Sequence, residues 1–234
     1  LSTSASFTAT AKQFRKLPYD PVRDFTPITQ IDTTSGNLLL VHPAVPARSI
    51  SELIGLAKAR PGEVKYASGG VGSAPHITAA LFAVTAGIQL MHVPYKGTVM
   101  GLTDVVGGRV EMITASPPAA IAFVNDGRLR ALGIAGPRRL PVLPQVPTID
   151  EAGVPGFNLV SWHGMWFPAG VPSDIVRRVQ AEVVKALATP EVQKQFADNF
   201  LFPAGTSPED FAAFVRKELA LQASIMKKVG IEPE

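Results

Sequence analysis

Apolar and polar positions follow two alternating periods along the middle of the chain. Short apolar runs are each followed by a segment with apolar residues at helical spacing, and glycine or proline separates the two. The pattern predicts strands at residues 64–67, 89–93, 109–114 and 129–135 and helices at 74–86, 98–106 and 118–125. Strands that alternate with helices in this way form a mostly parallel sheet covered on both faces, so the predicted fold class is α/β.

The flanking segments follow simpler patterns. β-type residues predict strands at 25–31 and 37–42, and a capping box formed by Ser49 and Glu52 starts a helix. A strand at 159–167 carries Trp162 and Trp166, four residues apart and therefore on one face. The remaining predicted elements are helices, at 148–153, 173–188, 190–199 and 207–228.

Composition narrows the function classes. With 234 residues, 46% hydrophobic and 18% charged, the chain is long enough for a sizeable core. The net charge of +3 comes without a basic cluster, which argues against nucleic-acid binding. The absence of cysteine excludes disulfides, thiolate metal sites and cysteine nucleophiles. No apolar run reaches membrane-spanning length.

The glycine-rich stretch after the predicted strand 64–67 is the first candidate site. Gly69, Gly70 and Gly72 permit positive φ and close approach of a ligand, and Ser73 is suited to cap the next helix. Together with Ser68 and the helix N-terminus, they could bind a carboxylate or phosphate. The spacing matches neither a dinucleotide fingerprint nor a P-loop, so a capped turn without a ligand is the alternative.

Two further strand–helix loops should lie at the same sheet edge, where open α/β sheets bind ligands. One carries Tyr95 and Lys96, and the other carries Ser116. Lys96 is either a ligand cation or a solvated loop lysine. His76 is either a ligand contact or a helix-surface residue, and Trp162 either packs in the core or lines a cleft.

Enzymatic signatures are missing from the sequence. There is no Gly-x-Ser-x-Gly elbow, and the four histidines have no metal-ligand spacing. No pair of carboxylates has a spacing suited to acid–base catalysis. We therefore predict no enzyme activity, no cofactor and no metal.

An ordered set of motifs resembles one family over essentially the whole chain. The motifs are Leu17-Pro-Tyr-Asp-Pro, Ser68-Gly-Gly-Val-Gly-Ser73, His92-Val-Pro-Tyr-Lys-Gly97, Gly127-Arg-Leu-Arg-Ala-Leu132, Val146-Pro-Thr-Ile-Asp-Glu-Ala-Gly153 and Pro168-Ala-Gly-Val-Pro172. This set resembles the substrate-binding receptors of tripartite tricarboxylate transporters, also called Bug-type periplasmic solute receptors.

The resemblance implies a two-domain periplasmic binding protein fold of type 2, a Venus flytrap with two crossing hinge strands. Domain I would comprise residues 1–34 and 163–234, and domain II residues 35–162. It also implies a periplasmic location, membrane transporter components as partners, and hinge closure on a small organic carboxylate. Di- and tricarboxylates, aromatic acids and acidic amino acids are the expected ligands.

Carried over by position, the family's ligand contacts fall on three groups of residues. They are Ser4, Ser6 and Phe7; Ser68, Gly69, Gly70, Gly72, Ser73 and His76; and Ala115 and Ser116, with Tyr95, Lys96 and Trp162 as additional candidates. Two positions depart from the family: Ala115 stands where some members have Asp, and Phe7 where His is frequent.

By the same resemblance, we expect the apolar strand and Pro-Pro-Gly-Gly-type loop with which family members begin to be missing from residues 1–234. We therefore expect a half-complete carboxylate site, with low stability or self-association. The alternatives to a receptor are a transferase-like enzyme that uses Lys96 or His76, and a truncated remnant that binds nothing.

Overall fold

The computed structural model describes residues 1–4, 7, 8 and 17–231. Internal contacts divide the chain into two compact units: unit 1 is Leu1–Thr34 with Ser161–Glu234, and unit 2 is Ser35–Val160. The chain therefore passes between the units twice. At the unit 1 end of these passages, the backbone N–H of Thr34 donates to the carbonyl oxygen of Ser161 at 2.8 Å. This bond holds the two passing strands side by side.

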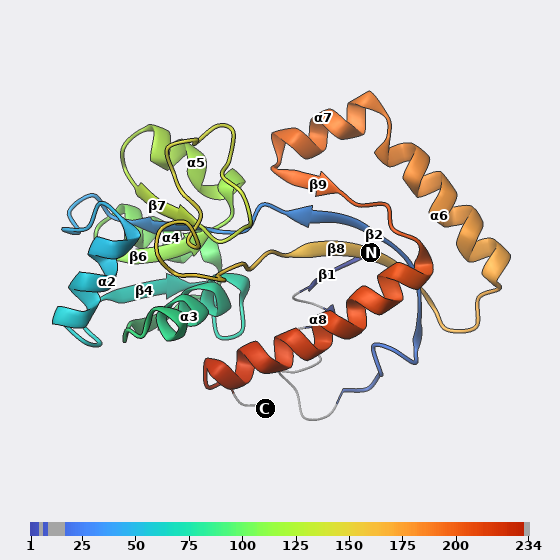
Figure 1. The fold of residues 1–234 in the computed structure, drawn as a ribbon, viewed down its shortest axis with the longest axis horizontal. Helices are drawn as coiled ribbons and strands as arrows, with labels where there is room; N and C mark the ends of the chain where they lie inside the picture. The colour runs from blue at the N-terminus through green and yellow to red at the C-terminus, as the bar shows by residue number, and fades with distance from the viewer. Residues whose placement is uncertain (5–6, 9–16, 232–234) are drawn as a thin grey trace. The chain divides into compact units, whose positions relative to one another are not determined.

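Unit 2 contains a five-stranded sheet in the order β5-β4-β6-β3-β7, of which β4, β6 and β7 are labelled in Figure 1. Its strands are β3 (Leu38–Val41), β4 (Lys65–Ser68), β5 (Met91–Pro94), β6 (Met112–Ala115) and β7 (Arg130–Ile134). Its helices are α2 (Ile50–Ala59), α3 (Ala74–Ala86), α4 (Thr98–Val106) and α5 (Pro117–Asn125). The predicted alternation of strands and helices is confirmed, and α3 and α4 have the predicted bounds.

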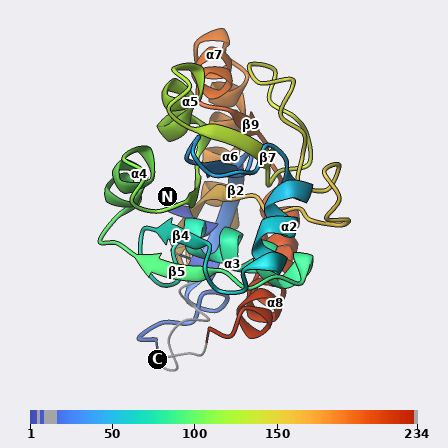
Figure 2. The same cartoon turned by 90° about the vertical axis from the view of Figure 1, so that its left-hand side faces the viewer.

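Helices α3 and α4 cover opposite faces of this sheet (Figure 2). Tyr66 of β4 faces α3, where its ring is parallel to that of His76. The next residue, Ala67, faces α4 closely enough that a Cβ on Gly101 would lie 3.0 Å from the Ala67 Cβ. Because successive strand residues point to opposite faces, the two helices must lie on either side. The α3 face carries the larger apolar core, which includes Leu39, Leu53, Tyr66, Phe82, Met112, Leu132, Ile149 and Phe157.

The prediction of a mostly parallel sheet is only partly correct. β4 pairs in parallel with β5 and β6, but β3 is antiparallel to both β6 and β7. The strands joined through α3, α4 and α5 therefore share one direction, and β3 alone is reversed. The cause is its connection: β3 ends at the sheet edge where β4 begins, so the segment containing α2 returns the chain to the same edge.

Unit 1 contains a four-stranded sheet in the order β1-β8-β2-β9, and every pairing is antiparallel. Its elements are β1 (Ser2–Thr3), β2 (Phe25–Thr34), β8 (Trp162–Pro168), α6 (Ser173–Leu187), α7 (Pro190–Asp198), β9 (Leu201–Pro203) and α8 (Pro208–Lys228). A mostly parallel sheet was therefore the wrong expectation for this unit. The C-terminal region is also not entirely helical, because β9 pairs with β2 between α7 and α8.

The core of unit 1 is aromatic. Trp162 is 1% exposed and meets Phe211 edge-to-face with ring centroids 5.7 Å apart. Trp166 lies 6.0 Å from Trp162 on the same face of β8, as predicted. Gly164 stands between them, and a Cβ at this position would overlap the Phe211 ring. The strand predicted at 159–167 begins at Trp162 in the structure. Trp162 belongs to unit 1, whereas the predicted domain II ended with it.

The predicted helix at 148–153 is replaced by a capped turn. The backbone N–H of Glu151 donates to the Thr148 hydroxyl, and the Glu151 carboxylate accepts from the Thr148 N–H in return. The cap formed as predicted, but Gly153 has φ +103°, which ends the turn before a helix can develop.

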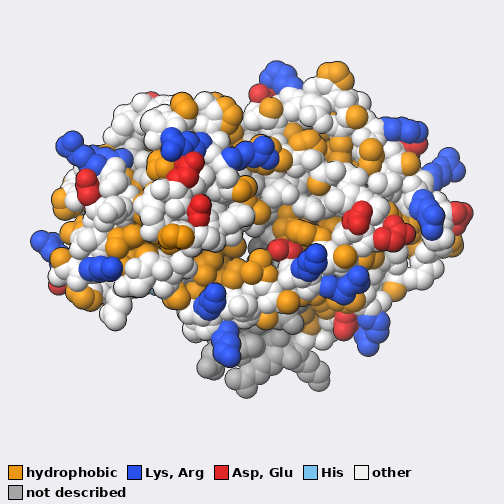
Figure 3. Space-filling view, viewed as in Figure 1, with side chains coloured by type: hydrophobic (Ala, Val, Ile, Leu, Met, Phe, Trp, Pro, Cys, Tyr) orange, Lys and Arg blue, Asp and Glu red, His pale blue; other side chains and the backbone are white. Residues whose placement is uncertain are grey.

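The surface carries charges of both signs. On the face shown in Figure 3, Lys and Arg side chains are scattered among Asp and Glu, in keeping with the net charge of +3. Within the described ranges, no helix is long and apolar enough to cross a membrane.

Candidate functional site

The loop between β4 and α3 requires each of its glycines. Gly70 and Gly72 have φ of +114° and +74°, a backbone conformation that is strained for any residue with a side chain. A Cβ on Gly69 would lie 2.8 Å from the hydroxyl oxygen of Thr98 and 3.0 Å from its backbone nitrogen. The loop therefore lies directly against the N-terminus of α4, which the sequence pattern alone did not predict.

Most donors of this loop are used internally. The Gly70 N–H donates to the Ser68 hydroxyl at 3.1 Å, and the Gly72 N–H donates to Nδ1 of His76 at 3.0 Å. Ser73 caps α3 by accepting the His76 N–H. Among the residues that the structure describes, Gly69, Val71 and Ala74 keep backbone N–H groups without an acceptor in this loop. Only these three N–H groups of residues 69–74 therefore remain available to a ligand within the described part of the chain.

His76 is buried and is not a helix-surface residue. It is 7% exposed and stacks on His92 at 4.1 Å, and His92 in turn stacks on Tyr66 at 4.9 Å. Burial, and to a lesser extent the charge of His92, lowers the pKa of His76 from 6.5 to about 4. Because Nδ1 accepts the Gly72 N–H, the neutral ring carries its proton on Nε2. His92 reaches the hydroxyl of the buried Ser68 through Nε2 at 2.6 Å.

The second loop presents the N-terminus of α4. In the described part of the chain, the N–H groups of Thr98, Val99 and Met100 have no acceptor, and no side chain caps this end. Lys96 is exposed just before the helix. The Tyr95 hydroxyl donates to Asp104 at 2.7 Å, so it is already engaged. Thr98 was missed as a candidate, although Gly97 before a helical pattern marks it as a first-turn residue.

The third loop offers a single hydroxyl group. Ser116 is exposed, and its side chain makes no capping hydrogen bond although it occupies the N-cap of α5. Pro117 and Pro118 follow it and have no N–H to donate. Ala115 is fully buried. Ser116 is therefore the available donor of this loop.

The described candidates of unit 1 lie in its core. Phe7 is 5% exposed and stacks on Trp166 at 4.1 Å. The Trp162 indole N–H donates to Glu218 at 2.9 Å, which satisfies its one polar group. Ser4 is buried, and its carbonyl oxygen accepts from the Thr8 hydroxyl. Ser6 lies outside the described residues.

The best-formed site is therefore the edge of the unit 2 sheet at the C-terminal ends of β4, β5 and β6. The N-termini of α3 and α4 supply backbone N–H groups there, Ser116 supplies a hydroxyl, and Lys96 is exposed beside them. These groups bind anionic oxygen atoms through hydrogen bonds and helix dipoles. Among the described residues, no group of three or more His, Asp or Glu side chains could hold a metal ion.

Comparisons with known proteins identify the family of this chain. A family model for the tripartite tricarboxylate transporter family receptor matches residues 1–231. A UPF0065 protein in the tcbD-tcbE intergenic region of Pseudomonas sp. (strain P51) is 37% identical over 206 residues, covering 88% of this chain and 61% of that protein. The chain thus spans about three fifths of this relative.

Two solved structures are similar over nearly the whole chain. R. palustris Rpa4515 with adipate has a TM-score of 0.88 and 33% identity, covering 100% of this chain and 78% of that one. MatC (Rpa3494) from Rhodopseudomonas palustris with bound malate has a TM-score of 0.80 and 29% identity, covering 96% and 77%. They confirm the predicted periplasmic binding protein fold.

The family consists of periplasmic solute-binding receptors, not enzymes. This confirms the prediction of a binding protein instead of an enzyme. The match extends over nearly all of the sequence, including both units. The chain therefore belongs to the receptor family of the tripartite tricarboxylate transporters.

Proposed function

We propose that this chain is the solute-binding part of a periplasmic receptor that captures a small organic dicarboxylate. The observation that carries the proposal is the donor-rich edge of unit 2, where free N–H groups of α3 and α4 lie beside the unengaged hydroxyl of Ser116. The adipate and malate bound by two similar proteins support the ligand class. Tri- and aromatic carboxylates and acidic amino acids remain in the proposed range.

The capture is proposed to proceed by hinge closure. The chain passes between its units after Thr34 and after Val160, and two such passages are a suitable hinge. The loaded receptor would deliver its ligand to the membrane components of a tripartite tricarboxylate transporter. The ligand contacts in this proposal are Ser68, Gly69, Gly70, Gly72, Ser73, His76 and Ser116, with Thr98 added from the geometry of α4.

Among these contacts, Ser116 gives the sharpest test. Its hydroxyl makes no hydrogen bond to the residues that the structure describes, so Ser116→Ala should leave the thermal midpoint within about 1 °C of the parent. A lost hydrogen bond to a carboxylate should weaken adipate or malate binding about tenfold. Calorimetric titration of both proteins with adipate, malate and citrate measures this difference.

The matched control is Ser173→Ala, an exposed serine at the start of α6 in unit 1. This variant should bind as the parent does. A folded parent chain that binds none of the acids would reject the proposal and favour a non-binding remnant. Equal affinities for the Ser116 variant and the parent would remove Ser116 from the site.

A further inference from the structure

A cavity lies in unit 2, at the sheet edge opposite the glycine loop. β3 and β7 pair so that Val41 at the end of β3 is opposite Arg130 at the start of β7. Leu38, at the other end of β3, is opposite Ala115, next to Ser116. The cavity at the Arg130 end has a volume of about 660 Å³, within the range of small-molecule sites.

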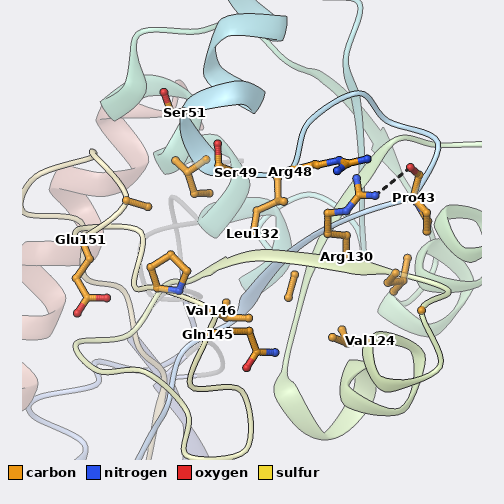
Figure 4. Close-up of a pocket in the computed structure, with 16 residues that line it drawn as sticks. Pro43, Arg48, Ser49, Ser51, Val124, Arg130, Leu132, Gln145, Val146 and Glu151 are labelled. Atoms are coloured by element: carbon orange, nitrogen blue, oxygen red, sulfur yellow. Dashed lines mark hydrogen bonds between the residues drawn. The ribbon is translucent and has the colours of Figure 1, made fainter.

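Arg130 is held in this cavity by neutral groups. Its guanidinium donates to the backbone carbonyl oxygens of Ala47 at 3.0 Å, Val45 at 3.3 Å and Pro43 at 3.4 Å. Figure 4 shows the bond to Pro43 at the upper edge of the pocket. Carbonyl oxygens orient the guanidinium but do not neutralise it, so a full positive charge remains in the cavity wall.

The cavity has a second arginine. Arg48 also lines this cavity, and Figure 4 draws both arginines among its lining residues. Across the residues that the structure describes, neither arginine forms an ion pair. Two positive charges on the lining of one cavity favour the binding of an anion there.

The nearby carboxylates are engaged elsewhere. Glu151 lines the cavity but pairs with Arg139 at 2.8 Å and accepts the Thr148 N–H. Glu52 accepts the backbone N–H of Arg48 at 2.6 Å, and no ion pair joins it to either guanidinium in the described ranges. In the described part of the chain, neither carboxylate therefore forms an ion pair with Arg48 or Arg130.

The start of α2 adds donors to the same wall. Ser49 caps this helix by accepting the Glu52 N–H at 3.1 Å. Within the described part of the chain, the backbone N–H groups of Ile50 and Ser51 have no acceptor, and both residues line the cavity. The helix N-terminus supplements the two guanidinium groups without being the main feature.

We propose that this cavity is a second anion site, which binds a small organic carboxylate or phosphate by its anionic oxygens between Arg48 and Arg130. The site is separate from the donor-rich edge at Ser116 and does not depend on the proposed receptor function. A ligand in this cavity would bind at the edge of the unit 2 sheet opposite Ser116.

The test is an NMR titration of the full chain with inorganic phosphate and, separately, with succinate. Saturable shifts are expected at the amides of Ile50, Ser51 and Leu132 in at least one of the two titrations. Phosphate alone would identify a tetrahedral anion, and succinate alone a carboxylate. Arg48→Ala should weaken the binding about tenfold, and it should still fold because Arg48 is exposed.

Arg177→Ala is the matched control, since it removes an exposed arginine from α6 in unit 1. Its affinity should equal that of the parent. Equal affinity of the Arg48 variant and the parent would overturn the proposal, as would shifts that stay linear to about 50 mM. Shifts at Val71 and Ala74 without shifts at Ile50 would place the anion at the other edge and also overturn it.

Discussion

Replacing Gly136 with alanine is expected to destabilise unit 2 by roughly 3 kcal/mol or more. The added Cβ would overlap the carbonyl oxygen of Ser35 and lie 2.7 Å from the carbonyl carbon. A Cβ on Gly36 would in turn lie 2.5 Å from the Gly136 nitrogen. The contact is backbone against backbone, so no flexible side chain can move to relieve it.

Urea unfolding followed by circular dichroism measures this loss. Gly55→Ala is the matched control, because Gly55 is exposed within α2 and a Cβ there would meet nothing within 4 Å. That variant should be more stable than the parent by about 0.5–1 kcal/mol, from the higher helix propensity of alanine. A Gly136 variant as stable as the parent would show that residues 35–36 and 136 are not in contact.

Acidification is expected to weaken unit 2 through His76. Its pKa is about 4 in the folded chain, below the 6.5 of an unperturbed histidine, because the ring is buried against His92. The unfolded chain therefore takes up the proton first. The stability from neutral His76 is complete above pH 6.5, falls between pH 6.5 and pH 4, and amounts to about 2 kcal/mol between pH 7 and pH 4.5.

His76→Asn isolates this contribution. The asparagine oxygen can still accept the Gly72 N–H, but it does not titrate. The difference in unfolding free energy between parent and variant should change by about 2 kcal/mol between pH 7 and pH 4.5. A difference that is independent of pH would contradict a buried, neutral His76.

His163 supplies a control of opposite sign. Its Nδ1 lies 2.7 Å from the carboxylate of the buried Asp32, and this hydrogen bond raises the pKa of His163. A raised pKa contributes stability that is present below pH 6.5 and is lost as the pH rises through the folded value. For His163→Asn, the difference from the parent should therefore be largest at low pH and shrink at high pH.

Local signals in the sequence predicted the elements of unit 2 well. The helices predicted at 74–86 and 98–106 are correct because cap residues mark their ends. Ser73 and Gly97 directly precede the two helices, and Gly87 and Gly107 directly follow them. The glycine loop was also recognisable, since Gly70 and Gly72 adopt the positive φ that glycine favours. These features depend on residues close to one another in the chain, so the sequence pattern predicts them.

The candidate site was predictable only as a location. The donor-rich edge lies where the strand–helix loops indicated, but the state of each donor depends on contacts across the fold. Gly72 was expected to offer its N–H, and His76 takes it up. Ser116 proved available because its side chain makes no capping bond. No sequence pattern distinguishes these two outcomes.

The sequence by itself determined the α/β class, the family, the caps and the glycine positions, because each depends on residue types and their order along the chain. The tertiary structure alone decided the reversed β3, the added strand β9, the burial of His76 and the cavity that Arg48 and Arg130 both line. Each of these joins segments that are distant in the chain. Such contacts form by pairing and packing across the sheet, and local periodicity carries no information about them.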